Sequence, residues 1–541
     1  MRYPDSTTRA DLIIRNAAIL DGLGGPVFHA DVAITGTRIS AVGNLGDTTA
    51  VKERDAAGMT LAPGFIDIHT HSDISVPYDP GQGSAIAMGV TTQVVGNCGL
   101  SVGFAQNREL FGFEKRAIEA HGGRLDWDDF AGSLRAVEDL GPATNYVPLA
   151  GHGTLRKRVV GMENRPADAT EMREMRLLLA EALEAGAWGL SSGLEYPPSS
   201  HAGEAELVEL CLEVALSAGI YATHLRNEGD TLQEAVQEAL NVARTAEIPL
   251  QLSHHKAEGR RNWGKVGITL PMVTAARADG MDVQLDQYPY TAFMTSLAVQ
   301  TLPRWALNGS QEDTLARLRD PAQRDRMAKE MAHAHPEWDD ANDRSAWEAI
   351  RIGVVRARPE LQGQSIADLA RNASIAPISY VLELLAQTEG FISAINFAID
   401  EADIAAVMQY PFTSIGSDGV GTHVGGSASH DRIHPRAYGC FPRVLGRYVR
   451  ELGVLTEPEA IRRMTSLPAD RLGLKDRGRI APGYFADITV YDSAIISDLA
   501  TYDEPHQYAQ GISMVLVNGR PALEQGNLTG TRAGSVLRRT T

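Results

Sequence analysis

The chain has 541 residues, of which 43% are hydrophobic, and this is enough to bury one large core or several ordinary ones. Its net charge of −18, without a long basic block, argues against nucleic acid and anionic membranes as partners, and we attribute the acidity to solubility. No apolar run comes near the roughly 18 residues of a membrane span, and residues 1–15 lack the apolar region of a signal peptide. Three cysteines are too few for a disulfide framework. We therefore expect a protein of the reducing cytoplasm.

Short apolar strands are predicted at both ends of the chain, separated by turns that contain glycine. The expected strands lie at residues 11–20, 31–42, 484–492 and 514–520. Neither end is long enough to bury a core alone. We therefore predict one small β-sandwich domain that is built from residues 1–62 and 478–541.

The long middle part, residues 63–477, alternates strands with helices. Strands are expected after the breaker Pro63–Gly64 and at residues 89–96, 189–193, 220–225, 248–255 and 281–286. Helices are expected at residues 170–185, 204–218 and 231–245. Repeated βα units over about 400 residues predict an α/β fold with a parallel sheet, namely a (β/α)8 TIM barrel with insertions. The active site of such a barrel lies at the C-terminal ends of its strands.

Residues 292–351 interrupt this alternation. The segment is rich in charged residues and contains Pro303, Pro321, Pro336 and tryptophans at 305, 338 and 347. Because long insertions in a domain tend to be functional lids, we predict a helical flap over the barrel mouth. The alternative is an exposed structural excursion without a part in catalysis.

Residues that can bind metal follow the predicted strands where they end. His69 and His71 are two residues apart, so on a strand their side chains point to the same face. The other candidates are Cys98, His224, His254, His255 and Asp418. In a barrel all of them meet at one mouth, where a thiolate, imidazoles and a carboxylate suit zinc with an open position for water. Zinc would lower the pKa of that water toward about 7, and Asp418 is the natural candidate to pass its proton to a leaving nitrogen.

Each candidate also has a structural interpretation. Cys98 alone is typical of a small buried residue, His224 of a core histidine, and Asp418 of a turn residue before glycine. It is their joint occurrence at strand ends that favours a metal site.

Several motifs together point to a known family. They are APGFIDIHTHSD, GVTTQVVGNCG, THLRNEG, SHHK, DQYPYTA, IGSDG, HPRAYGCFPRVLGRYVRE, AIRRMTSLPADRLGLKDRGRIAPGYFADITVYD and the closing MVLVNGR. On these motifs the chain resembles the amidohydrolase superfamily and, within it, the N-acyl-D-amino-acid deacylases, or D-aminoacylases. The similarity covers nearly the whole chain.

The resemblance implies a distorted TIM barrel, a β-sandwich from both termini, and zinc. A cysteine, here Cys98, replaces the bridging carboxylated lysine of most of the superfamily. The tight zinc would be held by Cys98, His224 and His254, with His69, His71 and Asp418 at a second position that is weaker or empty. We choose His254 over His255 because it is the first of the pair in the S-H-H-K pattern, and His255 remains the alternative.

The resemblance also assigns roles in substrate binding. Asp418 matches the general base and acid, and Lys256, Tyr288 and Tyr290 match positions that hold the substrate carboxylate or its carbonyl oxygen. A lysine and phenols beside zinc suit an anionic substrate end.

The implied activity is hydrolysis of a small molecule, an N-acyl-D-amino acid, to a D-amino acid and a carboxylate. The stretch 293–300 lacks the arginine expected of members that take N-acyl-D-glutamate, which indicates a neutral or apolar D-side chain, unless Phe293, Met294 and Leu297 are packing residues. Two alternatives are a cyclic-amide hydrolase of the hydantoinase or dihydroorotase type, which typically needs the bridging lysine, and a non-catalytic binding protein with the same fold. No oligomeric state is predicted.

Overall fold

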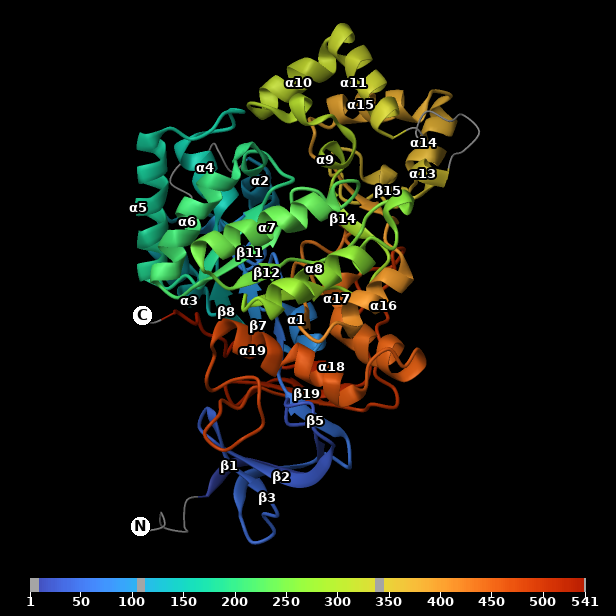
Figure 1. Cartoon of the computed structure of the whole chain (residues 1–541). Helices are drawn as coiled ribbons and strands as arrows, with labels where there is room; N and C mark the ends of the chain where they lie inside the picture. Colours follow the sequence, from blue (N-terminus) through green and yellow to red (C-terminus); the bar gives the residue numbers. More distant parts are fainter. Residues whose placement is uncertain (1–8, 105–111, 336–344, 540–541) are drawn as a thin grey trace.

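The computed structural model describes residues 9–104, 112–335 and 345–539. Figure 1 shows three parts: a sheet with β1, β2 and β3 at one end, a central body with the helices α5 to α8, and a group of helices with α10 and α11 at the other end. Parts of two predicted units, residues 1–8 and 540–541 of the β-sandwich and 336–344 of the flap, lie outside the described residues.

The central body is a closed parallel barrel. Its strands are β6 (Phe65–Asp67), β7 (Val90–Val95), β8 (Asn145–Pro148), β9 (Ala150–Gly151), β10 (Gly189–Gly193), β11 (Ile220–His224), β12 (Leu250–Leu252), β13 (Val283–Gln287) and β17 (Thr413–Ile415). Neighbours pair in parallel as β6-β7-β8 and β9-β10-β11-β12-β13-β17. β8 and β9 are consecutive parts of one barrel position, and a parallel bridge between Thr70 and Gly419 closes the ring. The predicted (β/α)8 barrel is therefore confirmed.

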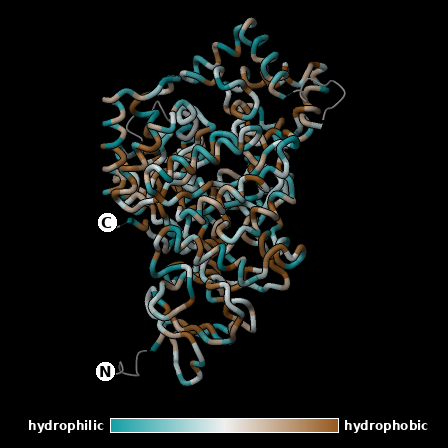
Figure 2. Tube along the Cα trace, in the orientation of Figure 1, coloured by the Kyte–Doolittle hydropathy of each residue, from teal (hydrophilic) through white to brown (hydrophobic). Residues whose placement is uncertain are grey.

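Amphipathic helices cover the outside of the barrel. The main ones are α5 (Ala169–Ala185), α6 (Glu204–Leu216), α7 (Leu232–Ala246) and α8 (Val266–Ala278). α5 begins at a capping box between Asp168 and Glu171, ends at Gly186 with φ 116°, and buries residues three or four apart. Figure 2 shows the resulting alternation of hydrophobic and hydrophilic segments along the peripheral helices. In the described ranges we find no helix with both the length and the apolar character to cross a membrane.

Further helices follow the barrel strands or pack beneath them. They are α1 (Gly83–Ala87), α2 (Gly112–Ala120), α3 (Phe130–Leu140), α4 (His152–Val159), α16 (Glu401–Gln409), α17 (Arg436–Arg443), α18 (Glu457–Met464) and α19 (Ser466–Leu472).

Strands from both termini form a second sheet with its own core. They are β1 (Ala10–Ile19), β2 (Phe28–Thr35), β3 (Arg38–Gly43), β4 (Ala50–Asp55), β5 (Thr60–Pro63), β18 (Ile488–Tyr491), β19 (Ile512–Val517), β20 (Arg520–Glu524) and β21 (Asn527–Leu528). β1 pairs with β4 through its first half and with β5 through its end, and its register with β2 shifts between Ile14 and Ala17. Between β5 and the barrel strand β6 lies Gly64, where any Cβ would come within 2.3 Å of the Thr91 side chain. This glycine lets the chain pass from the sheet into the barrel.

The third part is an insertion between β13 and β17. It contains β14 (Phe293–Ser296), α9 (Leu297–Thr301), α10 (Gln311–Arg319), α11 (Pro321–Ala334), α13 (Ser345–Glu348), β15 (Ile350–Ile352), α14 (Ile366–Ala373), α15 (Pro377–Gln387) and β16 (Ser393–Asn396). Its strands form an antiparallel sheet in the order β14-β16-β15, and its helices share a core around Leu318 and Trp347. The predicted flap boundary at residue 351 falls inside β15, and the strand paired with β15 runs to Asn396. The division into domains itself stays a prediction.

Candidate metal centre

The ends of five barrel strands bring the predicted metal-binding residues to one edge of the barrel. His69 and His71 follow β6, Cys98 follows β7, and His224 ends β11. His254 follows β12, and Asp418 follows β17. Because parallel strands end at the same edge, side chains that are up to about 350 residues apart in the sequence become neighbours.

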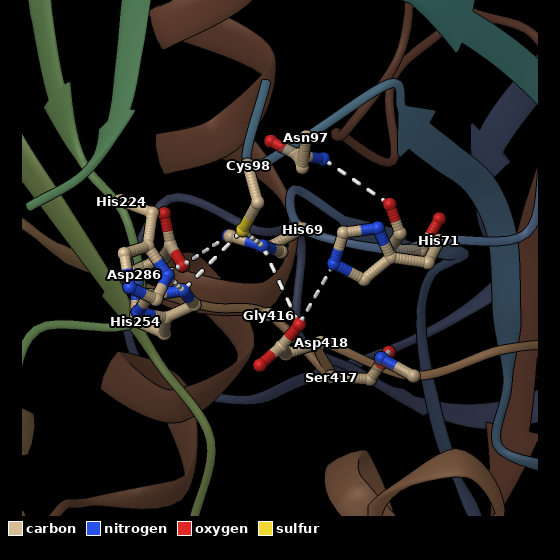
Figure 3. A network of polar contacts seen from close by, with 12 residues as sticks. His69, His71, Asn97, Cys98, His224, His254, Asp286, Gly416, Ser417 and Asp418 are labelled. Carbon is tan, nitrogen blue, oxygen red and sulfur yellow. Dashed lines mark hydrogen bonds and ion pairs between the residues drawn. The ribbon is translucent and has the colours of Figure 1, made fainter. Parts of the chain in front are cut away.

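The donor atoms face one another. The Cys98 sulfur lies 3.3 Å from His69 Nε2 and 3.4 Å from His254 Nε2, and His224 Nδ1 lies 2.9 Å from His254 Nε2. Figure 3 shows the thiol pointing into the group of histidine rings. Three sets among the described residues have donors within 4.8 Å of one another. Cys98 belongs to two of them, which are Cys98, His224 and His254, and His69, His71, Cys98 and Asp418; the third consists of Glu195, His224 and Glu228.

The chemistry of this group fits a divalent metal such as zinc. Burial alone would raise the pKa of Cys98, but the charges of His69 and His254 hold it well below its ordinary value, which favours the thiolate. Thiolate and imidazole are the donors that zinc prefers. A divalent cation would supply the positive charge that otherwise rests on protonated rings.

Three of the donors adopt an uncommon backbone conformation. Cys98, His254 and Asp418 have φ values of 52°, 33° and 50°, in the left-handed region that L-residues seldom adopt. Such residues cost on the order of 1–3 kcal/mol each and are typical of functional sites. Asp418 is held there partly by a 2.7 Å hydrogen bond that its N–H donates to His69 O.

Carboxylates lie behind three of the histidines; those of Asp286 and Glu228 are buried and that of Glu195 is half-buried. Asp286 Oδ1 is 3.0 Å from His69 Nδ1, Glu228 Oε1 is 3.1 Å from His254 Nδ1, and Glu195 Oε2 is 3.0 Å from His224 Nε2. In each ring the other nitrogen faces the Cys98 side. The sequence analysis missed these three carboxylates, although Glu228 lies in the motif THLRNEG and Asp286 lies on a barrel strand two residues before Tyr288.

Asp418 lies between a histidine and an arginine. Its Oδ1 is 3.1 Å from His71 Nε2, and its Oδ2 is 2.8 Å from the Arg436 guanidinium. Burial alone would raise the pKa of Asp418, but the charge of Arg436 and the hydrogen bond with His71 hold it well below its usual range. The sequence analysis also missed Arg436, which begins α17 directly after the conspicuous His434–Pro435 pair.

The structure separates the two histidines of the S-H-H-K motif. His254 faces Cys98, whereas His255 Nε2 lies 2.8 Å from Thr269 Oγ1 on α8. The geometry therefore favours His254 as the donor.

The three predicted substrate-binding residues lie in two places. Lys256 forms an ion pair with Glu228, and the Tyr288 ring lies 6.4 Å from the His254 ring and 4.6 Å from the Arg436 guanidinium, so both lie beside the metal centre. Tyr290 lies apart, against His434 at 5.1 Å. The roles of all three residues in binding stay predictions.

Comparison with known proteins assigns the family. The family model described as amidohydrolase family matches residues 52–523, which is most of the chain. The chain belongs to the amidohydrolase family. The superfamily resemblance that the motifs indicated is thereby confirmed.

Full-length relatives narrow the resemblance. This amidohydrolase is 36% identical over 531 residues to a D-aminoacylase of Alcaligenes xylosoxydans xylosoxydans, covering 98% of each chain. It is 37% identical over 531 residues to an N-acyl-D-glutamate deacylase of the same organism, covering 98% of this chain and 97% of the relative. Among solved structures, an N-acyl-D-glutamate deacylase from Bordetella bronchiseptica, in complex with zinc and a phosphonate mimic of the tetrahedral intermediate, matches with a TM-score of 0.81 at 33% identity, over 98% of this amidohydrolase and 100% of that chain.

Proposed function

We propose that this protein is a zinc-dependent hydrolase that cleaves the amide bond of N-acyl-D-amino acids to give a D-amino acid and a carboxylate. The observation that carries the proposal is the group of Cys98, His224, His254 and Asp418 at the barrel mouth. It occurs in a chain that is 36% and 37% identical over nearly its full length to relatives named for such reactions. The same relatives make the cyclic-amide and non-catalytic alternatives less favoured.

The tight metal position belongs to Cys98, His224 and His254, and His69, His71 and Asp418 line a second position. Zinc held there supplies a Lewis acid that polarises the amide carbonyl and makes water acidic enough to attack it near neutral pH. Cys98 lies at the boundary of both positions, because its sulfur is within 3.4 Å of His69 and His254.

Asp418 would move the proton. Its carboxylate is ionised and is fixed between His71 and Arg436, so one oxygen is oriented toward the donor cluster. It would accept a proton from the attacking water and deliver it to the amide nitrogen, which must be protonated to leave as an amine.

The substrate carboxylate would be bound by groups next to the donors. Lys256 and Arg436 place two buried cations there, and the buried Tyr288 hydroxyl has no hydrogen-bond partner in the described part of the chain. A free phenol O–H beside two cations suits an anionic or strongly polarised oxygen.

Strand β14 places neutral side chains near the metal centre. Tyr196, whose ring is 4.8 Å from that of His224, contacts Thr295 Oγ1 through its hydroxyl at 3.3 Å. The neighbouring Met294 is half-buried, whereas Phe293 and Leu297 are buried in hydrophobic cores and serve in packing. The contact of Thr295 with Tyr196 supports a preference for neutral D-side chains.

The test is a panel of N-acetyl-amino acids with zinc-loaded protein. We expect release of free amine from the D-forms of methionine, leucine and phenylalanine, slower release from D-glutamate and D-aspartate, and none from the L-forms. Hydantoin and dihydrouracil serve as cyclic controls. Hydrolysis of the cyclic compounds with no release from any D-form would contradict the proposal.

Other expectations stay proposals. They are the location in the cytoplasm and the lack of a nucleic-acid partner, both of which rest on composition and charge alone.

A further inference from the structure

Glu228 differs from the other carboxylates behind the histidines because it pairs with a lysine as well as with a histidine. Its Oε1 lies 3.1 Å from Nδ1 of His254, and its Oε2 forms an ion pair with Lys256 Nζ. Glu228 is 1% exposed and Lys256 is 5% exposed, so both contacts are shielded from water. Asp286 and Glu195 contact metal-centre histidines without a lysine partner among the described residues.

The backbone fixes where the Glu228 carboxylate lies. The residue follows β11 by four positions, and its carbonyl oxygen accepts a 2.8 Å hydrogen bond from the N–H of Glu258. This bond ties the loop after β11 to the loop after β12, which carries His254 and Lys256. His254 and Lys256, the two partners of the Glu228 carboxylate, therefore lie in a loop that is hydrogen-bonded to the backbone of Glu228 itself.

The arrangement determines which nitrogen of His254 carries the proton. Nε2 faces the Cys98 sulfur at 3.4 Å and must keep its lone pair to bind metal. Nδ1 then bears the hydrogen and donates it to Glu228. Outer carboxylates of this kind orient a ligating histidine and make it a stronger donor.

The same arrangement leaves one hydrogen of Lys256 available. An ammonium group has three donors. One is directed to Glu228 and a second to the carbonyl oxygen of His254 at 3.3 Å. Nζ also lies 3.0 Å from His254 Nδ1, but that nitrogen accepts no hydrogen from the lysine while it bears the one that it donates to Glu228. The third can reach an anion in the site, so Glu228 aims the lysine as well as the histidine.

We propose that Glu228 is a positioning residue that fixes the place of the substrate carboxylate relative to the metal. It does so by holding Lys256 and the metal ligand His254 with one carboxylate. The inference has two parts: in the lysine half Glu228 orients Lys256 toward the substrate carboxylate, and in the histidine half it supports His254 as a metal ligand. The lysine half rests on the proposed function, and the histidine half does not.

Glu195 provides a matched control. It contacts His224 in the same manner, at 3.0 Å, and its side chain is 21% exposed. Glu195→Gln therefore weakens the support of one metal ligand and leaves the contact between Glu228 and Lys256 in place. Glu228→Gln, with the same change of atoms, weakens the support of His254 and removes the charge that aims Lys256.

The first measurement is zinc retention against a graded chelator. Mutation of a group that is hydrogen-bonded to a metal ligand typically lowers metal affinity by about 10- to 100-fold. We therefore expect at least about a tenfold rise in the zinc dissociation constant for both Glu228→Gln and Glu195→Gln. Wild-type retention in Glu228→Gln would overturn the histidine half.

The second measurement compares KM for N-acetyl-D-methionine with KM for its α-carboxamide, at saturating zinc. We expect Glu228→Gln to reduce the preference for the carboxylate by about tenfold, which is about 1.4 kcal/mol, whereas Glu195→Gln keeps the wild-type ratio. An unchanged ratio in Glu228→Gln would overturn the lysine half, since a purely structural role would not separate the two substrates.

A double variant guards against misfolding caused by an unpaired lysine. Glu228→Gln combined with Lys256→Met removes both charges, and we expect it to fold and still to lose zinc more readily than wild type. If that variant folds and retains zinc like wild type, the histidine half is wrong. If wild type with zinc hydrolyses neither substrate, the proposed function fails together with the lysine half, and zinc retention alone decides the histidine half.

Discussion

Replacement of Cys98 by alanine removes the sulfur that the two donor sets share. Its Sγ lies within 3.4 Å of both His69 Nε2 and His254 Nε2, so its loss leaves the tight position with His224 and His254 only. Alanine tolerates φ 52° about as well as cysteine does, and the residue is small and 6% exposed. We therefore expect a cost in folding of roughly 1 kcal/mol or less, typical of a mild point mutation.

The effect on zinc should be much larger. Structural four-ligand zinc sites bind with apparent free energies of about 10–16 kcal/mol, which is about 2.5–4 kcal/mol per ligand if it is shared evenly. At about 1.4 kcal/mol for each factor of ten, loss of Cys98 should weaken zinc binding by about 100- to 1000-fold. The remaining imidazoles would hold zinc only at high concentration.

The assay is zinc content per chain after equilibration with a graded chelator. Cys211→Ala is the control, because Cys211 is fully buried on α6 in the apolar core and no metal-binding group contains it in the described residues. We expect Cys211→Ala to follow wild type and Cys98→Ala to lose zinc at a far lower chelator concentration. If the curves of Cys98→Ala and wild type coincide, Cys98 is not a ligand and the assignment of the tight position is wrong.

Two further predictions test other parts of the structure. His254→Asn should lose zinc and hydrolysis, whereas His255→Asn, which changes a side chain directed to α8, should keep its zinc; equal losses in metal analysis would refute the distinction. Burial alone would raise the pKa of Glu206, but the hydrogen bond with His152 and the charge of Arg156 lower it from 4.5 to about 2. Because the folded pKa lies below the unfolded one, this contribution is complete above about pH 4.5 and is lost as the pH falls toward 2. Glu206→Gln leaves the buried Arg156 without its carboxylate partner, so denaturant titration should show a free energy of unfolding that is about 3–5 kcal/mol lower at pH 7. That free energy should also depend less on pH between 5 and 3 than in wild type. Parallel plots of the free energy of unfolding against pH for the two proteins would contradict the assigned pair.

Much of the barrel could be predicted because its signals are local. The helix at 170–185 is observed as Ala169–Ala185 and ends at Gly186, and the buried strand at 89–96 is observed as Val90–Val95. The strand expected at 248–255 has only three residues, Leu250–Leu252, because the chain bends so that His254 can face the barrel mouth. Apolar periodicity carries no information about such a bend.

The extent of the insertion could not be predicted for a related reason. Its charged and proline-rich part stands out in the sequence, but β15, α14, α15 and β16 have ordinary composition and join it through an antiparallel sheet and a shared hydrophobic core. Long-range strand pairing of this kind leaves no mark on the local pattern.

The candidate metal ligands could be predicted from their positions at strand ends, but the groups that contact them could not. Glu195, Glu228, Asp286 and Arg436 matter through contacts with residues that lie elsewhere in the chain. Single acidic residues after strands are common in turns and caps. Only the fold shows which of them meet a histidine.

The most direct test of the central claim is the resolution of racemic N-acetyl-methionine by the zinc-loaded protein, followed by chiral chromatography. We predict that hydrolysis stops when half of the substrate is consumed, that the free amino acid is D-methionine, and that a chelator abolishes the reaction while added zinc restores it. Release of L-methionine, or no release from a protein that has bound zinc, would contradict the account.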